Sequence, residues 1–264
     1  MVIYAYPKVN ICFKITSILP NNYCEIASRF MLVESANLCD TIEICESSAF
    51  KIAGNFDCTM QENTIFKAKE ALGAFLDSQG ATKMRDSLEF FSIEVDKKIP
   101  AFAGLGGGSS DAASYLMAMN EILELNLTRK DLMQVGANVG ADVSFFLCDF
   151  KSANVFGIGE SVEFFSEDLI RLEIITPPIA CSTRAVYDEF RAMKARGEVD
   201  FFTKTRELLT KDSATLLREN TRDFLNDLYT PACRIYPDLA DFAKDGYFFS
   251  GSGSSFFRIK NRAK

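Results

Sequence analysis

The glycine-rich run GLGGGSSDAA, at residues 104–113, constrains the fold more than any other feature of the chain. Four of its first five residues are glycine, and a backbone without Cβ atoms can approach a ligand closely and adopt positive φ angles. The apolar run 112–125 predicts a helix that begins near Ser110, with Ser109 and Ser110 offering hydroxyls beside the unpaired amides of its first turn. Because such a helix start attracts anions, the run predicts a cradle for the phosphate groups of a nucleotide.

The chain contains no histidine, which narrows the chemistry that it can perform. This composition excludes Ser-His-Asp and Cys-His nucleophile systems, HExxH zinc sites and acid–base catalysis by an imidazole. Any general base must therefore be an aspartate, glutamate, lysine, tyrosine or cysteine.

Composition indicates a globular protein of one large or two ordinary domains: 264 residues, 48% hydrophobic and 25% charged. The net charge of −7 argues against nucleic acid or an anionic membrane as the main partner. No apolar run reaches the ~20 residues that span a bilayer, the first residues lack a basic leader, and the eight cysteines include no CxxC pair. We therefore expect a cytoplasmic protein, a monomer or weak homodimer, that binds small molecules and neither nucleic acid nor a membrane.

Hydrophobic periodicity predicts a mixture of strands and helices on both sides of a boundary near residues 150–160. Before it, we expect strands at 4–14, 24–33, 40–46, 48–53 and 90–95, a turn at 19–22, helices at 64–79, 110–125 and 128–139, and a buried apolar piece at 143–147. After it, we expect strands at 162–165, 172–176 and on both sides of a glycine turn in 248–259, and helices at 183–195, 204–209, 213–218 and 236–244. This order predicts an α+β fold with domains at 1–155 and 156–264.

The glycine-rich run does not match two common phosphate-binding loops, because specific residues differ. A Walker A loop ends in Gly-Lys-Ser/Thr, whereas Ser109 follows Gly108 directly. A Rossmann fingerprint needs an acidic residue about 20 residues later, at the end of a second strand. Here that region instead starts a helix, with Thr128 and Asp131 forming a capping box. An NAD-dependent dehydrogenase is therefore disfavoured.

The loop that fits is the glycine-serine signature of the GHMP kinase superfamily, which residues 104–113 resemble. Two more superfamily motifs have counterparts in order: YPKVNICFKI at 6–15 and FFSGSGSSFF at 248–257. The resemblance implies an α+β, two-domain fold. Its N-terminal nucleotide-binding domain would be similar to domain 2 of ribosomal protein S5, and its C-terminal domain would be ferredoxin-like.

Within the superfamily, GADVSFF at 140–146 and the Asn226-Asp-Leu228 segment followed by Pro231 are most similar to the branch that acts on a diphosphocytidyl methylerythritol. The resemblance implies phosphorylation of the 2-hydroxyl of that sugar alcohol with ATP and Mg²⁺, in isoprenoid precursor synthesis by the non-mevalonate pathway. The alternatives are a kinase of homoserine or mevalonate type, or a catalytically silent nucleotide-binding module.

The resemblance assigns catalytic roles to Lys8 and Asp142. Asp142 would accept the proton of the acceptor hydroxyl, whereas its position after Gly140-Ala141 also fits a residue that caps a helix or forms a turn. Lys8 would offset the charge on the transferred phosphoryl group, whereas its alternating strand also fits a solvent-facing lysine.

The resemblance also implies which residues bind the donor and the acceptor. The ATP phosphates would be held by Gly104, Leu105, Gly106, Gly107, Gly108, Ser109 and Ser110, with Ser110 near Mg²⁺ and no protein metal site assigned. The acceptor would be held by Asn10, Tyr23, Cys24, Tyr187, Gly251 and Ser252, with core aromatics as the alternative for the two tyrosines and an ordinary hairpin turn for Gly251 and Ser252.

Two residues depart from the superfamily's pattern. Cys24 stands where many members have a histidine that contacts the cytosine, and a thiol cannot supply the paired donor and acceptor of an imidazole. We therefore expect base recognition to rely more on backbone groups and on stacking. Ser144 stands where a proline is usual, which affects loop stiffness.

Overall fold

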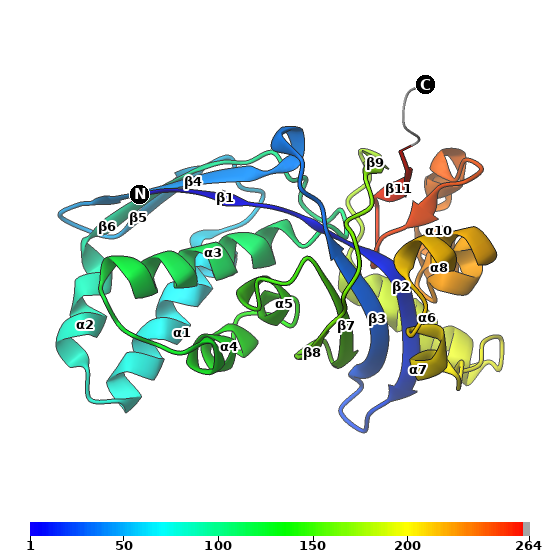
Figure 1. The fold of residues 1–264 in the computed structure, drawn as a ribbon, viewed down its shortest axis with the longest axis horizontal. Coiled ribbons are helices and arrows are strands. Elements are labelled where there is room, and N and C mark those ends of the chain that lie inside the picture. The colour runs from blue at the N-terminus through cyan, green and yellow to red at the C-terminus, as the bar shows by residue number, and fades with distance from the viewer. Residues whose placement is uncertain (261–264) are drawn as a thin grey trace. The chain divides into compact units, whose positions relative to one another are not determined.

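The computed structural model describes residues 1–260, which form two compact units (Figure 1). Unit 1 consists of Met1–Pro7, Glu34–Ile99 and Gly106–Asp149, and unit 2 consists of Lys8–Val33, Pro100–Leu105 and the chain from Phe150 onward. Each unit is therefore assembled from segments that are distant in the sequence. The expected division into domains 1–155 and 156–264 concerns family domains rather than compact units, and it stays a prediction.

Unit 1 contains a four-stranded sheet in the order β1-β4-β6-β5, antiparallel except where β5 runs parallel to β6. Its helices lie on one face of this sheet (Figure 1). Alternate residues of the central strands are buried, among them the paired Ile42 and Val95, and Ile44 and Ile93. The elements are β1 (Val2–Ala5), β4 (Asp40–Glu46), β5 (Lys51–Gly54), β6 (Phe91–Asp96), α1 (Thr64–Ser78), α2 (Thr82–Ser87), α3 (Gly107–Ile122), α4 (Arg129–Ala137), α5 (Val143–Leu147) and 3₁₀ turns at Ala36–Leu38, Met60–Glu62 and Leu88–Phe90.

Two helices of unit 1 begin as their sequences predict. Asn63 caps α1 by accepting from the amide of Ile65 at 2.9 Å, and the expected apolar face of this helix is buried. Thr128 and Asp131 form the expected capping box at the start of α4. Both starts are local effects of side chains close in sequence.

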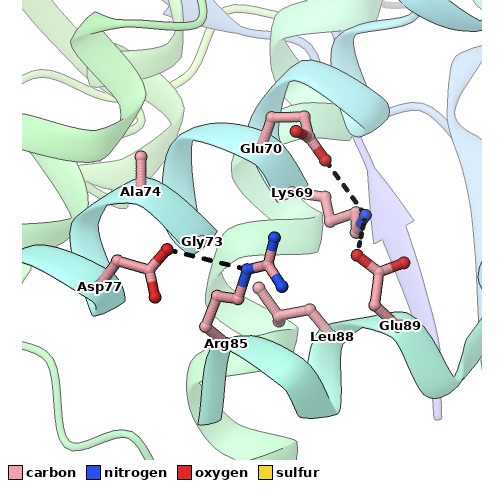
Figure 2. A pocket seen from close by; sticks show the side chains of 8 residues that line it. All are labelled: Lys69, Glu70, Gly73, Ala74, Asp77, Arg85, Leu88 and Glu89. Carbon is pink, nitrogen blue, oxygen red and sulfur yellow. Dashed lines mark hydrogen bonds and ion pairs between the residues drawn. The ribbon is translucent and has the colours of Figure 1, made fainter. Parts of the chain in front are cut away.

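A cavity of about 160 Å³ in unit 1 is lined mainly by charged side chains of α1, α2 and the turn after α2 (Figure 2). Lys69 pairs with Glu70 at 3.1 Å and with Glu89 at 2.6 Å, and Arg85 lies 3.8 Å from Asp77. These charges neutralise one another, and no residue expected to bind ATP or the acceptor lines the cavity. It is therefore not the candidate site.

Unit 2 contains two antiparallel sheets, in the orders β2-β3-β7-β8 and β10-β11-β9. Helices α8 and α9 contact β2, and α6 packs against α10. The elements are β2 (Lys8–Ile18), β3 (Cys24–Leu32), β7 (Ser152–Gly157), β8 (Ser161–Phe164), β9 (Leu172–Ile175), β10 (Phe248–Phe249), β11 (Phe256–Ile259), α6 (Thr183–Ala195), α7 (Thr205–Leu208), α8 (Ser213–Glu219), α9 (Arg222–Leu225), α10 (Tyr229–Ile235) and a 3₁₀ helix at Pro237–Phe242.

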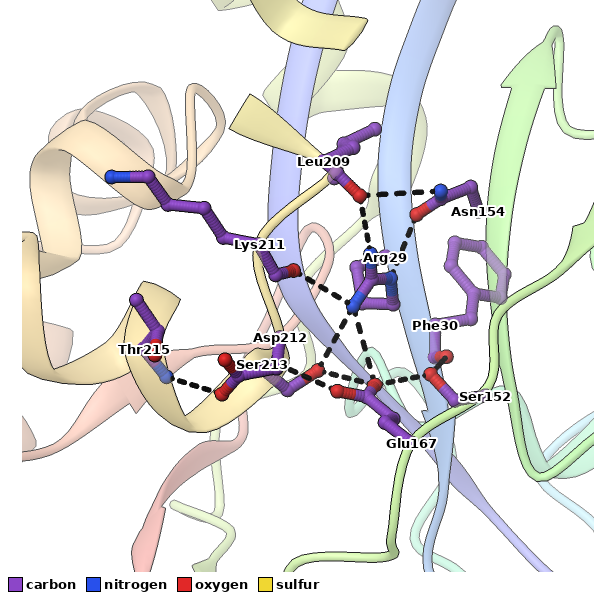
Figure 3. A network of polar contacts seen from close by, with 10 residues as sticks. All are labelled: Arg29, Phe30, Ser152, Asn154, Glu167, Leu209, Lys211, Asp212, Ser213 and Thr215. Atoms are coloured by element: carbon purple, nitrogen blue, oxygen red, sulfur yellow. Dashed lines mark hydrogen bonds and ion pairs between the residues drawn. The ribbon is translucent and has the colours of Figure 1, made fainter. Parts of the chain in front are cut away.

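A buried arginine on β3, Arg29, binds residues of several other segments of unit 2 (Figure 3). The guanidinium of Arg29 donates to Asn154 Oδ1 at 2.7 Å and to the carbonyl of Leu209 at 2.6 Å. It also pairs with Glu167 at 3.2 Å. Because an unpaired buried charge is costly, these partners are what allow Arg29 to lie in the core.

Most expected elements are confirmed, and with them the α+β class. The strand expected at 4–14 is instead two strands, β1 and β2, separated at Tyr6 and Pro7. Helix α3 begins at Gly107, three residues before the expected start, and 143–147 is helical. The 236–244 segment forms a 3₁₀ helix over Pro237–Phe242 rather than an α-helix. Strand β7 and helices α2, α9 and α10 were not expected. Within residues 1–260, no helix has the length and apolar character needed to cross a membrane.

Candidate functional site

The residues expected to bind substrates are divided between the two units. The chain passes from unit 2 to unit 1 inside the glycine loop, between Leu105 and Gly106. Unit 2 holds Lys8, Asn10, Tyr23, Cys24, Gly104, Leu105, Tyr187, Gly251 and Ser252, and unit 1 holds Gly106, Gly107, Gly108, Ser109, Ser110 and Asp142.

Lys8 and Asn10 form a buried pair on β2. They lie two residues apart, which places both side chains on one face of the strand. Lys8 is 4% exposed and Asn10 is 1% exposed, so the alternative of a solvent-facing lysine is wrong. The Lys8 ammonium donates to Asn10 Oδ1 at 2.6 Å and lies 4.5 Å from the centre of the Phe30 ring. The fold therefore holds a cation in place at the start of β2.

Asn10 is fixed by its neighbours on three sides. Its Nδ2 donates to Ser28 Oγ at 3.1 Å, and Ser28 in turn donates to the carbonyl of Cys12 at 2.5 Å. Its backbone amide donates to Ser250 Oγ at 3.2 Å, and Ser250 Oγ donates to the carbonyl of Gly104 at 2.9 Å. Strand β2, the C-terminal glycine turn and the first residue of the glycine loop are thus joined by hydrogen bonds.

The two glycine-rich segments of unit 2 approach each other at Gly104. This residue has φ of +71°, and a Cβ atom there would lie 2.2 Å from the carbonyl oxygen of Ser250. Only glycine fits such a position. Gly251 also has a positive φ, and Ser252 Oγ lies 2.9 Å from Thr183 Oγ1 of α6. The turn at 250–254 connects the antiparallel strands β10 and β11, as a hairpin turn does, and it also bonds to Gly104 and Thr183 in other segments of unit 2.

The residues expected at the base of the acceptor lie at the start of β3 and in α6. Tyr23 is 60% exposed, so it is not a core aromatic, and Tyr187 is half-buried with its ring edge toward Phe13. Cys24 is buried, which raises the pKa of its thiol. The guanidinium of Arg191 lies 4.0 Å from its sulfur and donates to the carbonyl of Asn22 at 3.0 Å.

Unit 1 supplies the start of helix α3. Gly106 precedes the helix with φ of +70°, and the amide of Ser110 bonds to its carbonyl at 2.9 Å. Ser109 and Ser110 therefore lie inside the helix rather than at its cap. The amides of Gly107, Gly108 and Ser109 come before the first amide that bonds within the helix, that of Ser110. A Cβ atom on Gly107 would lie 2.7 Å from Ile99, and one on Gly108 3.1 Å from Thr64.

Asp142 precedes α5 and is half-buried. Asp142 lies in the turn that precedes the helix, which agrees with the turn alternative, and its side chain forms no capping hydrogen bond with the first turn. In the same unit, the Ser110 hydroxyl donates to the carbonyl of Tyr6 at 2.8 Å. Its oxygen lone pairs remain able to accept a proton or to ligate a cation.

Sequence reasoning missed Asp111, the residue after Ser110. Asp111 is 2% exposed and pairs with Lys97 at 2.6 Å, and Lys97 also pairs with the buried Asp40. Asp40 in turn accepts from the amides of Lys98 and Ile99. Asp111 Oδ1 has no hydrogen-bond partner. Its position in the glycine-loop motif could have marked Asp111 as a candidate. Its partners, Lys97 and Asp40, are distant in sequence, so no local pattern predicts the pairing.

The described residues 1–260 contain no group of three or more acidic, cysteine or histidine side chains that could hold a metal ion. Magnesium commonly binds through substrate phosphates, water and one or two protein oxygens. In the glycine loop, the Ser110 hydroxyl is a protein oxygen that could ligate such a cation.

Comparison with known proteins places these features in context. Residues 63–149 match the model of the GHMP kinases N terminal domain. The chain is 43% identical to a 4-diphosphocytidyl-2-C-methyl-D-erythritol kinase of Sulfurimonas denitrificans, over 98% of this chain and 96% of the relative. It is 41% identical to the kinase of the same name from Helicobacter pylori, over 98% and 94%. A crystal structure of 4-(cytidine 5'-diphospho)-2C-methyl-D-erythritol kinase is similar with a TM-score of 0.73 and 26% identity, over 98% of this chain and 90% of that one.

Proposed function

The chain belongs to the GHMP kinase superfamily, in the family of the 4-diphosphocytidyl-2-C-methyl-D-erythritol kinases, and we propose that Lys8 and Asp142 are its catalytic residues. The reaction is ATP-dependent phosphorylation of the 2-hydroxyl of 4-diphosphocytidyl-2-C-methyl-D-erythritol, in isoprenoid precursor synthesis by the non-mevalonate pathway. The single observation that best supports the assignment of the site is the buried ammonium of Lys8, held by Asn10 in a protein without histidine.

The proposed chemistry is one in-line displacement. The 2-hydroxyl oxygen forms a bond to the γ-phosphorus of ATP, the bond to the β,γ-bridging oxygen breaks, and ADP leaves. Asp142 orients the hydroxyl and accepts its proton, because the chain offers no imidazole. Lys8 offsets the negative charge that spreads over the transferred group.

The donor is held by the glycine loop. The amides of Gly106, Gly107, Gly108 and Ser109 face the phosphates at the start of α3, and Gly104 and Leu105 lead into this turn. These groups carry partial positive charge at a helix start, which favours phosphate. Mg²⁺ would come with ATP and neutralise its phosphates, with Ser110 as the protein oxygen nearest to it.

The acceptor is held by unit 2. Asn10 contacts the sugar alcohol, Gly251 and Ser252 close over the phosphates or the acceptor, and Tyr23 and Tyr187 stack on the cytosine. Cys24 stays a neutral thiol because burial raises its pKa. Backbone groups next to it therefore carry the hydrogen bonds to the base.

The location and the assembly state belong to the same proposal. All eight cysteines are free thiols, which fits the reducing cytoplasm. We propose a cytoplasmic enzyme that works as a monomer or a weak homodimer, with residues 1–155 as its nucleotide-binding domain and 156–264 as its C-terminal domain.

A panel of acceptors tests the function. Purified protein with ATP and Mg²⁺ is expected to release ADP with 4-diphosphocytidyl-2-C-methyl-D-erythritol and not with homoserine or mevalonate. Turnover with homoserine or mevalonate alone would contradict the substrate while sparing the superfamily. No turnover with any acceptor, together with ATP binding, would indicate a silent nucleotide-binding module.

A further inference from the structure

The segment Asn226-Asp227-Leu228, between α9 and α10 of unit 2, has no role in the chemistry described so far. It is nonetheless placed in the interior: Asn226 is 2% exposed and Leu228 is fully buried. A buried primary amide needs hydrogen-bond partners for two N–H groups and one carbonyl. The partners of Asn226 therefore show what this position does.

Asn226 binds the C-terminal glycine turn on both sides of Ser250. Its Nδ2 donates to the carbonyl of Phe249 at 2.9 Å and to the carbonyl of Gly251 at 3.0 Å. Its Oδ1 accepts from the amide of Leu228 at 2.8 Å. All the hydrogen-bonding groups of the amide are used, so the side chain has one orientation.

The same dipeptide binds strand β2. The backbone amide of Asp227 donates to the carbonyl of Phe13 at 2.9 Å, and its carboxylate accepts from the amide of Ile15 at 2.8 Å. The carboxylate also pairs with Lys14. Asn226 and Asp227 thus connect the turn to the strand that carries Lys8 and Asn10.

We propose that Asn226 is a positioning residue that sets the 250–254 turn against β2 for phosphoryl transfer. The proposal rests on the proposed function, because it assumes that Asn10 and Gly251 contact the acceptor. The turn and the strand already meet through Ser250 Oγ, which accepts from the amide of Asn10. By fixing the carbonyls of Phe249 and Gly251, Asn226 fixes the residue between them.

The residue type follows from the two carbonyls. An amide donates to both at once, whereas an isosteric carboxylate would present lone pairs to them and repel them. A displacement of reacting groups by about 1 Å lowers the rate by about 100-fold. Asn226 therefore affects turnover without touching substrate.

The test compares Asn226→Asp and Asn226→Ala with the matched control Asn220→Asp in the full-length protein. Asn220 also donates its Nδ2 to a carbonyl, that of Leu216 at 2.9 Å, but it does not contact the turn. We expect Asn226→Asp to lower kcat by about 10-fold to 100-fold, with a smaller change in KM for ATP. The control is expected to keep kcat within about twofold.

A pH profile separates positioning from loss of stability. In Asn226→Asp, a buried carboxyl becomes protonated as pH falls and can then donate one O–H to a carbonyl of the turn. The kcat of this variant relative to the parent is therefore expected to rise from pH 8 to pH 6, whereas the ratio for Asn226→Ala stays flat. Both are measured at temperatures where thermal unfolding shows all proteins to be folded.

Hydrogen exchange of the 248–257 peptide tests whether Asn226 holds the turn in place, and this measurement does not depend on turnover. We expect faster exchange of this peptide in Asn226→Asp than in Asn220→Asp. Unchanged exchange, or unchanged kcat of the folded variant, would overturn the proposal. If the parent fails to phosphorylate the acceptor, the proposed function fails, and the exchange result still decides whether Asn226 holds the turn.

Discussion

At the scale of single residues, burial rather than an unusual residue type distinguishes the proposed catalytic lysine. Lys8 is an ordinary strand lysine in the sequence, and its burial beside Asn10 is what makes it a fixed cation. The motif in 6–15 predicts a catalytic role for Lys8, and this stays a prediction, whereas the partners of Asn10 lie as far along the chain as Ser250. Contacts across such separations are set by tertiary packing, so no local pattern predicts them.

Replacing Lys8 with methionine tests the role of its charge. Lys8→Met keeps most of the side-chain volume and removes the ammonium, so we expect kcat to fall by about 10²-fold to 10³-fold, as when a donor to transition-state charge is removed. The matched control is Lys51→Met, because Lys51 is a strand lysine exposed to solvent. Equal losses of ADP release in the two variants would contradict a specific role for Lys8.

Asp111 predicts a pH dependence of stability. Burial raises its pKa to about 7, with Asp40 adding to the effect and Lys97 opposing it. Between about pH 4 and about pH 7 the folded state therefore holds a proton that the unfolded chain has lost. This stabilisation is present below about pH 4 and is lost as pH rises toward 7.

The isosteric variant Asp111→Asn removes this titration. We expect the parent to lose unfolding free energy relative to Asp111→Asn as pH rises from 4 to 7, with little further change from 7 to 8. Urea unfolding of both proteins at each pH provides the measurement. A constant difference across this range would show that Asp111 is ionised in the folded protein throughout.

At the scale of elements, the sequence predicts best those that depend on local signals. The apolar face of α1 and the capping box of α4 are examples. The sequence did not predict strand β7, because Ser152–Gly157 contains few β-branched residues. This strand forms by pairing with β3. The sequence did not predict helix α10, because Pro231 suggests a break in the helix. In the structure Pro231 lies in the first turn of α10, where the missing N–H of proline costs little.

Glycine at position 104 tests how the two glycine-rich segments meet. Gly104→Ala and the control Gly197→Ala both place a side chain at φ of +71°, but only the first has a close neighbour, the carbonyl oxygen of Ser250. We expect Gly104→Ala to lose about 1–3 kcal/mol more unfolding free energy than the control, as overpacking does, and to raise KM for ATP. Chemical denaturation measures the loss of stability, and steady-state kinetics measures KM. Equal stability losses in Gly104→Ala and Gly197→Ala would show that the 250–254 turn moves away from the added methyl group without a loss of free energy.

At the scale of the whole molecule, the residues of the proposed site belong to two units whose segments alternate along the chain. The residues of the glycine loop belong to both, with Gly104 and Leu105 in one and Gly106–Ser110 in the other. The motifs in the sequence predicted the family and the reaction, because they combine in one chain and in a fixed order. The assembly of two units from six segments could not be predicted, since it depends on pairings between distant strands.

Comparing turnover with ATP affinity in Asp142→Asn tests the central claim most directly. With 4-diphosphocytidyl-2-C-methyl-D-erythritol, the parent is expected to form the 2-phosphate and ADP in equal amounts, as phosphorus NMR and ADP release would show. Asp142→Asn is expected to lose at least about 10²-fold in kcat, the low end for a positioned general base, and to keep the parent's affinity for ATP. A variant that retains full turnover, or a parent that forms no 2-phosphate from this acceptor, would contradict the account.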